Sequence, residues 1–372
     1  MILVLQCLAE RNEFSMNKGS EIFDVLVAGG GPAGATVALC LTRRGLRVQL
    51  VEASSYQKSR YGETLPPEMN PVLRELGLSE PFEQLSSLPA HGIVSAWGDA
   101  MLVEMDFLRN VHGNGWHVDR REFDRMLVRE AEKAGARIEL GRRVNAQRGR
   151  NGVWLTADCS ARLLVDATGR NGMRIDGSAE RELEDELIAI VLTLQLKREP
   201  GTEDLRTYIE AAPDGWWYIA PVPQGRVIVM FFTDPTIYRE DGILMSQQLE
   251  RAPLVARRLA GGRILDSQVL RVSSSCRREM FGDRWLAVGD SAFSVDPISG
   301  RGIFNAMRWA EDAAGAIADA LDRDRQALGG FAARMRRQYD EYVRQRRTYY
   351  SLEQRWSELK FWRQRSVRRV PR

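Results

Sequence analysis

The sequence predicts an α/β fold in which a parallel sheet with its helices is joined by an inserted antiparallel sheet and a helical C-terminal segment. Three observations lead to this prediction. A strand, a glycine-rich turn, a helix and a second strand follow one another over 23–52. Two later apolar strands, at 162–168 and 285–288, also run directly into turns of small residues. Between them, 187–196 and 206–233 show the composition of strands in an antiparallel sheet.

The first of these segments has the pattern of a dinucleotide-binding unit. An apolar strand over 23–28 leads into Gly29-x-Gly31-x-x-Gly34, a helix follows over 33–44, and a strand over 47–51 ends in Glu52. Gly29 permits the tight turn, Gly31 lets the backbone approach a pyrophosphate, and Gly34 lets the helix pack closely on the strand. The helix N-terminus favours phosphate groups, and Glu52 is placed to accept hydrogen bonds from an adenosine ribose. We therefore predict a Rossmann-type domain.

Composition narrows the class of protein. The 372 residues suffice for two domains, or for one large domain with an inserted sheet. A formal charge of +3 favours no nucleic acid or other polyanionic partner. Four widely spaced cysteines fit a reduced, cytoplasmic protein, and neither they nor the three histidines have the spacing of a metal site. No run of about twenty apolar residues predicts a transmembrane helix, and whether residues 1–15 are native stays open.

The other elements follow from periodicity and from glycine and proline. Pro66 and Pro67 keep 53–67 in a loop. The remaining helical patterns, ended by glycine or opened by a capping residue such as Asp119, lie at 69–76, 121–134, about 303–321 and 331–372. The remaining strand patterns lie at 92–97, 101–107, 137–144, 152–158, 216–222 and 226–232. We expect the third and fourth of these strands to form a hairpin, and the last two to pair across Pro223-Gln224-Gly225.

Three separated strand ends can face one ligand. Besides the fingerprint, these are the strand that ends in Asp166-Ala-Thr-Gly169 and the stretch from Gly289 to Gly302. The carboxyl ends of the strands in such a sheet face one crevice. Asp290 at a strand end can bind a ribityl hydroxyl, and the backbone of Pro297-x-x-Gly300-x-Gly302 can approach a flavin ring. The helix that begins near 303 would aim its positive end at the flavin.

With these motifs in this order, the sequence resembles the p-hydroxybenzoate-hydroxylase-type flavoproteins, which include FAD-dependent monooxygenases and halogenases. The resemblance covers nearly the whole chain and implies a glutathione-reductase-like FAD-binding domain. It also implies that Arg120, within Asp119-Arg120-x-x-Phe123-Asp124, contacts FAD. The residues assigned to FAD by the motifs and the resemblance are Gly29, Gly31, Pro32, Ala33, Gly34, Glu52, Arg120, Asp166, Gly169, Asp290, Pro297, Gly300 and Gly302.

The resemblance divides the chain into alternating parts of two domains and a tail. The FAD-binding domain is expected over 20–85, 111–180 and 271–325, the substrate domain over 86–110 and 181–270, and the helical tail over 326–372. No second G-x-G-x-x-G is present, so NAD(P)H would have no Rossmann domain of its own. Electrons would come from NAD(P)H or from a separate flavin reductase, with O₂ as co-substrate.

Two stretches are similar to the tryptophan-halogenase-like branch of the class. Tyr61–Pro66 resembles its G-E-x-x-x-P loop, and Gly215–Pro221 resembles its G-W-x-W-x-I-P signature, with Tyr218 in place of the second Trp. Halogenases also need a lysine near the substrate, in the stretch after the loop. No lysine occurs between Lys58 and Lys133, where His91 is the nearest nitrogen base, and this weighs against halogenation.

The sequence is most similar to the monooxygenases that mature quinone-cofactor enzymes by hydroxylating a tryptophan of a partner protein. The matching features are Ser95-Ala96-Trp97-Gly98, Asp296-Pro297-Ile298-Ser299 with Gly302-Ile303, and an aromatic, basic C-terminal ending. Arg301 stands where many monooxygenases of the class have glutamine. The resemblance implies an FAD-dependent monooxygenase that forms a C4a-hydroperoxyflavin and hydroxylates an electron-rich aromatic small molecule, a peptide or a protein tryptophan.

Candidate catalytic residues are Glu63, as a base on an indole N–H or phenol, His91 as a weaker base, and Trp216 and Tyr218. The last two, with Trp97 and Trp217, would line the substrate cavity or pack the core of the sheet. The alternatives are a halogenase, an isoprenoid double-bond reductase of the same fold, and a flavin-binding partner without catalysis. The basic tail is either a solvated face or a docking site for an acidic partner protein.

Overall fold

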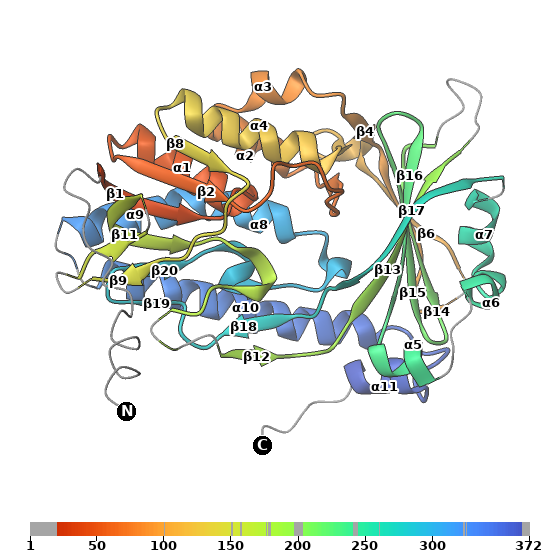
Figure 1. Ribbon diagram of the computed structural model, residues 1–372. Helices are drawn as coiled ribbons and strands as arrows, with labels where there is room; N and C mark the ends of the chain where they lie inside the picture. The colour runs from red at the N-terminus through yellow and green to blue at the C-terminus, as the bar shows by residue number, and fades with distance from the viewer. Residues whose placement is uncertain are drawn as a thin grey trace, which may run out of the picture.

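Two large sheets and a layer of helices make up the molecule (Figure 1). The computed structural model describes residues 21–366 apart from 100, 150–151, 157, 176, 178–179, 197–203, 241–244, 260, 323 and 325. The first twenty residues, including 1–15 whose native status is open, and the last six residues therefore lie outside the described residues. Within that part of the chain, no helix is long and apolar enough to cross a membrane.

The first sheet has the order β19-β20-β11-β1-β2-β8. Its members are β1 (Glu21–Ala28), β2 (Val48–Glu52), β8 (Arg137–Leu140), β11 (Cys159–Asp166), β19 (Phe281–Gly282) and β20 (Trp285–Ala287), with β9 (Gln147–Arg148) and β10 (Trp154–Leu155) paired beside β11. The run from β20 to β8 is parallel, and β19 is antiparallel to β20. The carboxyl ends of β1, β2, β11 and β20 therefore meet at one edge.

The helices that cover this sheet pack side by side. They are α1 (Pro32–Arg43), α4 (Arg120–Lys133), α8 (Gly302–Arg308), α9 (Ala310–Leu321) and α10 (Ala327–Ser351), with the shorter α2 (Met69–Glu75) and α3 (Ser79–Glu83) beyond. Helix α1 packs between α4 and α9, and α10 packs against α9. The apolar residues of α1, such as Val37 and Leu41, are buried against β1 and these neighbours, because the helix has helices on both flanks.

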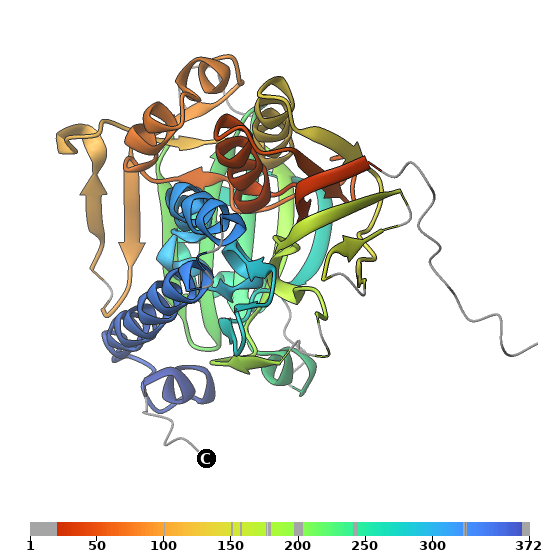
Figure 2. The same ribbon diagram turned by 90° about the vertical axis from the view of Figure 1, so that its left-hand side faces the viewer.

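The second sheet has seven strands in the order β17-β13-β16-β15-β14-β5-β6. Its members are β5 (Gly92–Ala96), β6 (Val103–Asp106), β13 (Ile188–Gln195), β14 (Thr207–Ala212), β15 (Gly215–Val222), β16 (Arg226–Thr233) and β17 (Arg263–Arg271). All neighbours are antiparallel except β14 and β5, which are parallel. Helices α6 (Met245–Glu250) and α7 (Pro253–Leu259) cover its outer face, and the hairpin of β5 and β6 projects at one side (Figures 1 and 2).

Small sheets and turns join the two parts. One sheet contains β3 (Thr64–Leu65), β7 (Gly115–His117) and β4 (Leu88–Ala90), and the other contains β12 (Arg181–Leu183), β18 (Ser275–Arg277) and β21 (Phe293–Ser294). The short 3₁₀ turns are η1 (Phe107–Arg109), η2 (Gly169–Asn171), η3 (Gly289–Ser291) and η4 (Pro297–Ser299). Helices α5 (Pro235–Glu240) and α11 (Lys360–Ser366) lie near each other at the end of the second sheet (Figure 1).

Several sequence predictions are confirmed and others are wrong, among them the helix expected over 331–372, which is interrupted between Ser351 and Lys360. The hairpin of β15 and β16 forms as predicted, and the Asp119 carboxylate accepts the hydrogen bond from Arg121 N–H that caps α4. The predicted hairpin of 137–144 and 152–158 does not form, because β8 joins β2 as a parallel strand and the second segment supplies β10. The predicted helix over 303–321 is broken at Trp309, whose φ and ψ of −91° and 0° separate α8 from α9.

The aromatic ending of the chain is part of the core. Helix α10 runs along the first sheet and reaches the second, and α11 follows it (Figure 1). Phe361 and Trp362 are fully buried, and Arg365 forms an interior ion pair with Asp234. These three side chains are therefore unavailable to a partner protein, and docking of an acidic partner by other residues of the basic tail stays a prediction.

Candidate functional site

Three glycines, Gly29, Gly34 and Gly289, allow close approaches between segments where the parallel strands end. A Cβ atom on Gly34 would lie 2.0 Å from the carbonyl oxygen of Gly29, and one on Gly29, whose φ is +108°, would lie 2.3 Å from the Ala167 oxygen. One on Gly289 would lie 2.6 Å from the Ala33 Cβ. Gly31, by contrast, has no atom within 4 Å of the place where its Cβ would be. The protein therefore does not require glycine at 31 for its own packing.

Glu52 is buried at the end of β2 and makes contacts through both carboxylate oxygens. The Gly30 N–H donates to Oε2 at 2.6 Å, while Ser54 and the Arg60 guanidinium donate to Oε1. Burial acts to raise the pKa of Glu52, but the hydrogen bonds from Ser54 and Gly30 and the charge of Arg60 leave that pKa lowered. The carboxylate is thus held ionised beside the glycine turn, where it can accept ribose hydroxyl groups.

Arg120 holds the loop that contains Gly62. Its Nη1 donates to the carbonyl oxygens of Tyr61 and Gly62, and the rest of the guanidinium pairs with Asp124. Asp124 also pairs with Arg60, so the ion pairs are continuous from Glu52 to this loop. Arg120 therefore positions the loop beside the crevice, and a contact of Arg120 with FAD stays a prediction. The role of Arg60 in these ion pairs was not expected from the sequence, because no motif in the loop distinguishes Arg60 from other arginines.

The turn after β11 is stabilised by Asp166. This side chain is fully buried, accepts hydrogen bonds from the backbone of Thr168 and Met173, and forms an ion pair with Arg277 at 2.7 Å. The Arg277 side chain is itself 1% exposed. Asp166 therefore shapes the turn that contains Gly169, whose φ is +79°, and a direct contact with FAD stays a prediction.

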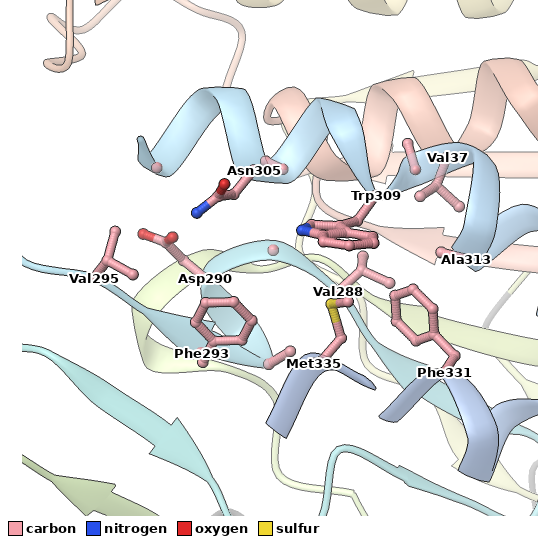
Figure 3. Close-up of a pocket in the computed structure, with 15 residues that line it drawn as sticks. Val37, Val288, Asp290, Phe293, Val295, Asn305, Trp309, Ala313, Phe331 and Met335 are labelled. Carbon is pink, nitrogen blue, oxygen red and sulfur yellow. The ribbon is translucent and has the colours of Figure 1, made fainter. Parts of the chain in front are cut away.

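The turn after β20 brings Asp290 to the same edge. Its carboxylate lies 3.3 Å from Nε of Arg170, and in Figure 3 it points toward Asn305 at the start of α8. The narrow pocket in this view, which reaches from Asp290 past Trp309 to Met335, has a volume of only about 20 Å³. This is room for about one water molecule, so the pocket is too small to hold a substrate.

The predicted flavin-contacting turn is fixed by α10. Asp296, which precedes Pro297, accepts hydrogen bonds from the Ile298 N–H, from the Arg346 Nε and from the Tyr350 hydroxyl. Its own N–H donates to the Tyr342 hydroxyl. The turn passes through Gly300, which has a left-handed conformation with a φ of +59°, and Gly302 begins α8 with its N-terminus toward this edge. Arg301 is half exposed and lies over the Phe304 ring.

Glu63 is the buried acid between this edge and the second sheet. Glu63 is 2% exposed. Its Oε2 accepts the Gly62 N–H at 3.0 Å, and its Oε1 has no hydrogen-bond partner among the described residues. Burial raises the pKa of Glu63, against the opposing influence of the Tyr218 hydroxyl. A Cβ on Gly62 would lie 3.6 Å from Ile303 of α8, so this loop adjoins the helix that faces the crevice.

The structure separates the other candidates. Tyr218 lies beside Glu63, but His91 is exposed at the start of β5. Trp216 is stacked on Phe232, with ring centroids 3.9 Å apart, and is buried under α10 and α11. Trp217 points to the opposite face of the sheet, toward α7. Both tryptophans therefore pack the core, which is the second of the two roles expected for them, and a catalytic role for Trp216 stays a prediction.

Trp97 is also buried, with its ring against Tyr349 and Trp362. Sequence reasoning missed two polar residues near Glu63, namely His117 and Thr64. Both lie in short strands, β7 and β3, that pair with each other, and their side chains meet only because of that register. Two-residue and three-residue strands have no periodicity from which such a pairing could be predicted.

The residues present fit an FAD molecule. The open position of Gly31 leaves space for a pyrophosphate at the N-terminus of α1, and the ionised Glu52 lies where the ribose is expected. The turns that contain Asp290 and Gly300 would hold the ribityl chain and the ring. The fold and this crevice define an FAD-dependent oxidoreductase.

Comparison with known families agrees. The chain belongs to the family described as the FAD binding domain, whose model matches residues 23–346. A putative FAD-dependent oxidoreductase, LodB of Marinomonas mediterranea, is 28% identical over 367 residues, which cover 93% of this chain and 97% of that protein. A tryptophan 2-halogenase of Chondromyces crocatus is 25% identical, over 79% of this chain and 60% of its own length.

Solved structures show the same fold. The myxobacterial chondrochloren halogenase CndH has a TM-score of 0.81 and 25% identity, over 93% of this chain and 86% of that one. The peptidyl tryptophan dihydroxylase QhpG has a TM-score of 0.74 and 24% identity, over 92% of this chain and 78% of that one. The chain thus shares its fold with a flavin-dependent halogenase and with a peptidyl tryptophan dihydroxylase.

Proposed function

We propose that this protein is an FAD-dependent monooxygenase that hydroxylates an indole, as in the tryptophan of a peptide or protein. Reduced FAD supplies the activation of O₂, and the protein positions the indole and excludes water. The substrate would bind between the edge of the first sheet and the inner face of the second, where Glu63 and Tyr218 meet. NAD(P)H or a separate flavin reductase would provide the electrons, as expected from the sequence.

The observation that carries this proposal is the chemistry of the side chains at that boundary. Halogenases of this branch depend on a lysine near the substrate, which the sequence lacks between Lys58 and Lys133. The lysines among the described residues, Lys58, Lys133 and Lys360, are all exposed. A buried carboxyl and a phenol lie at the boundary instead. These groups can hold or move a proton but cannot carry an electrophilic halogen as an amine can.

Two of the similar proteins support an indole as the substrate class. One is named a tryptophan 2-halogenase and the other a peptidyl tryptophan dihydroxylase. The similarity to LodB over nearly the whole of both chains supports an oxidoreductase of the same size, without the additional length of the halogenase relative.

The test is product analysis with matched anions. The FAD-loaded protein is supplied with a flavin-reducing system, O₂ and N-acetyl-tryptophanamide or tryptophan-containing peptides, in chloride, in bromide and in a halide-free buffer. We expect products heavier by one or two oxygen atoms in all three buffers. Halogen incorporation that requires chloride or bromide would show a halogenase instead, and release of hydrogen peroxide without any modified product would contradict both activities for these substrates.

A further inference from the structure

Exposed apolar side chains gather on the hairpin that projects from the second sheet (Figures 1 and 2). Among the described residues, six of the sixteen exposed large hydrophobic side chains lie in the short segment 101–111. They are Met101, Leu102, Val103, Met105, Leu108 and Val111. Apolar side chains gathered in this way mark a place where another molecule binds. We call residues 101–111 the hairpin edge.

Strand β6, within the hairpin edge, is the last strand of the second sheet. In the part of the chain that the structure describes, β5 is the one strand that pairs with it. The Phe107 N–H, directly after β6, donates to the His91 carbonyl at 2.9 Å. Because the backbone groups of alternate residues point to opposite sides of a strand, those of Glu104 and Asp106 point away from β5. An added strand would find these donors and acceptors available.

The apolar side chains of β6 continue the face of the sheet on which the substrate is proposed to bind. In the strand register, Val103 lies opposite Ser95, and Ser95 lies opposite Ile209. Ile209 in turn lies opposite Tyr218. Residues opposite each other share a face, so Val103 and Tyr218 lie on the same face, as does Met105, two residues from Val103. Val103 is 58% exposed and Met105 is 60% exposed.

The charge of β6 selects the segment that can join it. Glu104 and Asp106 lie on the other face, and the ion pair of Glu104 with Arg206 leaves the Glu104 side chain 59% exposed. A second copy of β6 that paired over both residues would set carboxylate against carboxylate, which is destabilising. A segment with basic side chains on this face, alternating with apolar side chains that cover Val103 and Met105, matches both faces of the strand.

We propose that the hairpin edge binds an extended segment of the substrate polypeptide as an additional strand of the second sheet. Apolar and basic residues alternate along this segment. The inference rests on the proposed function, in that the substrate is a peptide or protein, and it names what is recognised besides the indole. The backbone of β6 provides affinity for an extended chain, and its side chains provide the choice among such chains.

The sheet geometry also gives the distance between this segment and the target tryptophan. Neighbouring strands lie about 4.8 Å apart, so an added strand beyond β6 would lie four spacings, or about 19 Å, from Tyr218. An extended chain covers about 3.3 Å per residue, so at least about six residues must separate the segment from the tryptophan. Free tryptophan derivatives and shorter peptides would enter the site without help from the hairpin edge.

Binding of labelled peptides to the oxidised, FAD-loaded protein tests the inference without any reaction. The probes are fluorescein-labelled peptides of Lys-Val repeats and of Glu-Val repeats, equal in length and followed by fluorescence anisotropy. We expect the Lys-Val peptide to bind about tenfold or more tightly, with a difference that shrinks as the salt concentration rises.

Paired variants at the two edges of the sheet locate the binding site. The variant with Val103→Ser and Met105→Ser should bind the Lys-Val peptide about tenfold or more weakly, because two apolar contacts are lost. The matched control has Ile264→Ser and Val269→Ser, also at exposed positions, on β17 at the opposite edge of the same sheet. This control should bind the peptide as the wild type does.

Two further peptides test the pairing and the spacing. Methylation of one set of alternate amides in the Lys-Val peptide should abolish binding, because those N–H groups face β6, while methylation of the other set should leave binding nearly unchanged. A tryptophan joined to the Lys-Val peptide should be hydroxylated with a lower KM when the spacer has eight residues than when it has two, with little change in kcat.

Absence of binding by the Lys-Val peptide, equal affinity in wild type and the β6 variant, equal effects of the two methylated sets, or loss of binding in the β17 control would overturn the inference. So would dimerisation of the peptide-free protein, seen by analytical ultracentrifugation, that the β6 variant abolishes, because the edge would then bind a second copy. Hydroxylation of N-acetyl-tryptophanamide without peptide binding would support the proposed function and overturn this inference. Peptide binding without hydroxylation would do the reverse.

Discussion

The burial of α11 makes a quantitative prediction about the ending of the chain. Trp362 is 0% exposed, packs against Trp97 with ring centroids 5.2 Å apart, and donates from Nε1 to the Ala212 carbonyl at 3.0 Å. Truncation of a buried Trp to Ala costs about 3–5 kcal/mol through lost burial and the cavity left behind. An unpaired buried carbonyl adds about 1–3 kcal/mol. Because such effects overlap, Trp362→Ala should lower the free energy of unfolding by about 4–6 kcal/mol.

Equilibrium urea unfolding followed by circular dichroism measures this loss. The matched control is Trp356→Ala, since Trp356 is half-buried and lies on the outer side of the same cluster, 6.2 Å from Trp362. We expect the control to lose about 1 kcal/mol, close to the median for point substitutions. Equal losses in the two variants, or a loss below about 1 kcal/mol for Trp362→Ala, would refute the assignment of α11 to the core.

The other predictions concern the cofactor crevice and the buried histidine. Gly31→Ala should fold with unchanged stability but lose FAD affinity, whereas Gly34→Ala should lose stability even without FAD; thermal unfolding of apoprotein and flavin titration separate the two. Glu52→Gln should weaken FAD binding by about 1.5–3 kcal/mol, the value of hydrogen bonds to a charged group, and fluorescence titration would contradict this if affinity stayed constant. The lowered pKa of buried His117 should reduce the free energy of unfolding by up to about 3 kcal/mol as the pH falls from 6.5 to about 4, because the unfolded chain binds a proton on His117 at higher pH than the folded chain does. Urea unfolding across this pH range in a Glu63→Gln background, with and without His117→Asn, measures this pH dependence.

The cofactor crevice was predictable because its constraints are local. Gly29 and Gly34 allow backbone contacts within one strand-turn-helix unit, and the unit extends over fewer than 30 residues, so spacing alone identifies it. Glu52 could be placed for the same reason. The strand at 137–140 could not be paired correctly, since a short alternating segment does not record whether its partner is the previous strand or the next.

The fate of Trp216 shows a second limit. Neighbouring residues of a strand point to opposite faces, so Trp216 and Trp217 of β15 lie on different sides of the sheet, although both were expected together, at one cavity or in the core. The strand pattern also does not reveal what covers each face. The cover for Trp216 is α10, whose Tyr350 accepts the hydrogen bond from the Trp216 Nε1 at 3.0 Å across 134 residues of chain. When the covering helix is this distant in sequence, the sequence of an aromatic strand face does not distinguish the wall of a cavity from a packed core.

The hydrogen bond between Trp216 and Tyr350 also shows how the C-terminal helices connect the two large sheets. The Tyr350 hydroxyl accepts from Trp216 in the second sheet and donates to Asp296, which begins the turn that would contact the flavin. One phenol thus fixes the distance between the sheet that would carry the substrate and the turn that would carry the cofactor. Arg346 forms ion pairs with the Asp296 carboxylate and with Asp185, so this contact between the two parts of the molecule is a buried ion-pair network. Removal of one of its members would leave an uncompensated buried charge. An FAD-dependent oxidoreductase must hold its substrate close to the flavin to within a fraction of an ångström, and a junction of this kind supplies that rigidity from outside both binding surfaces.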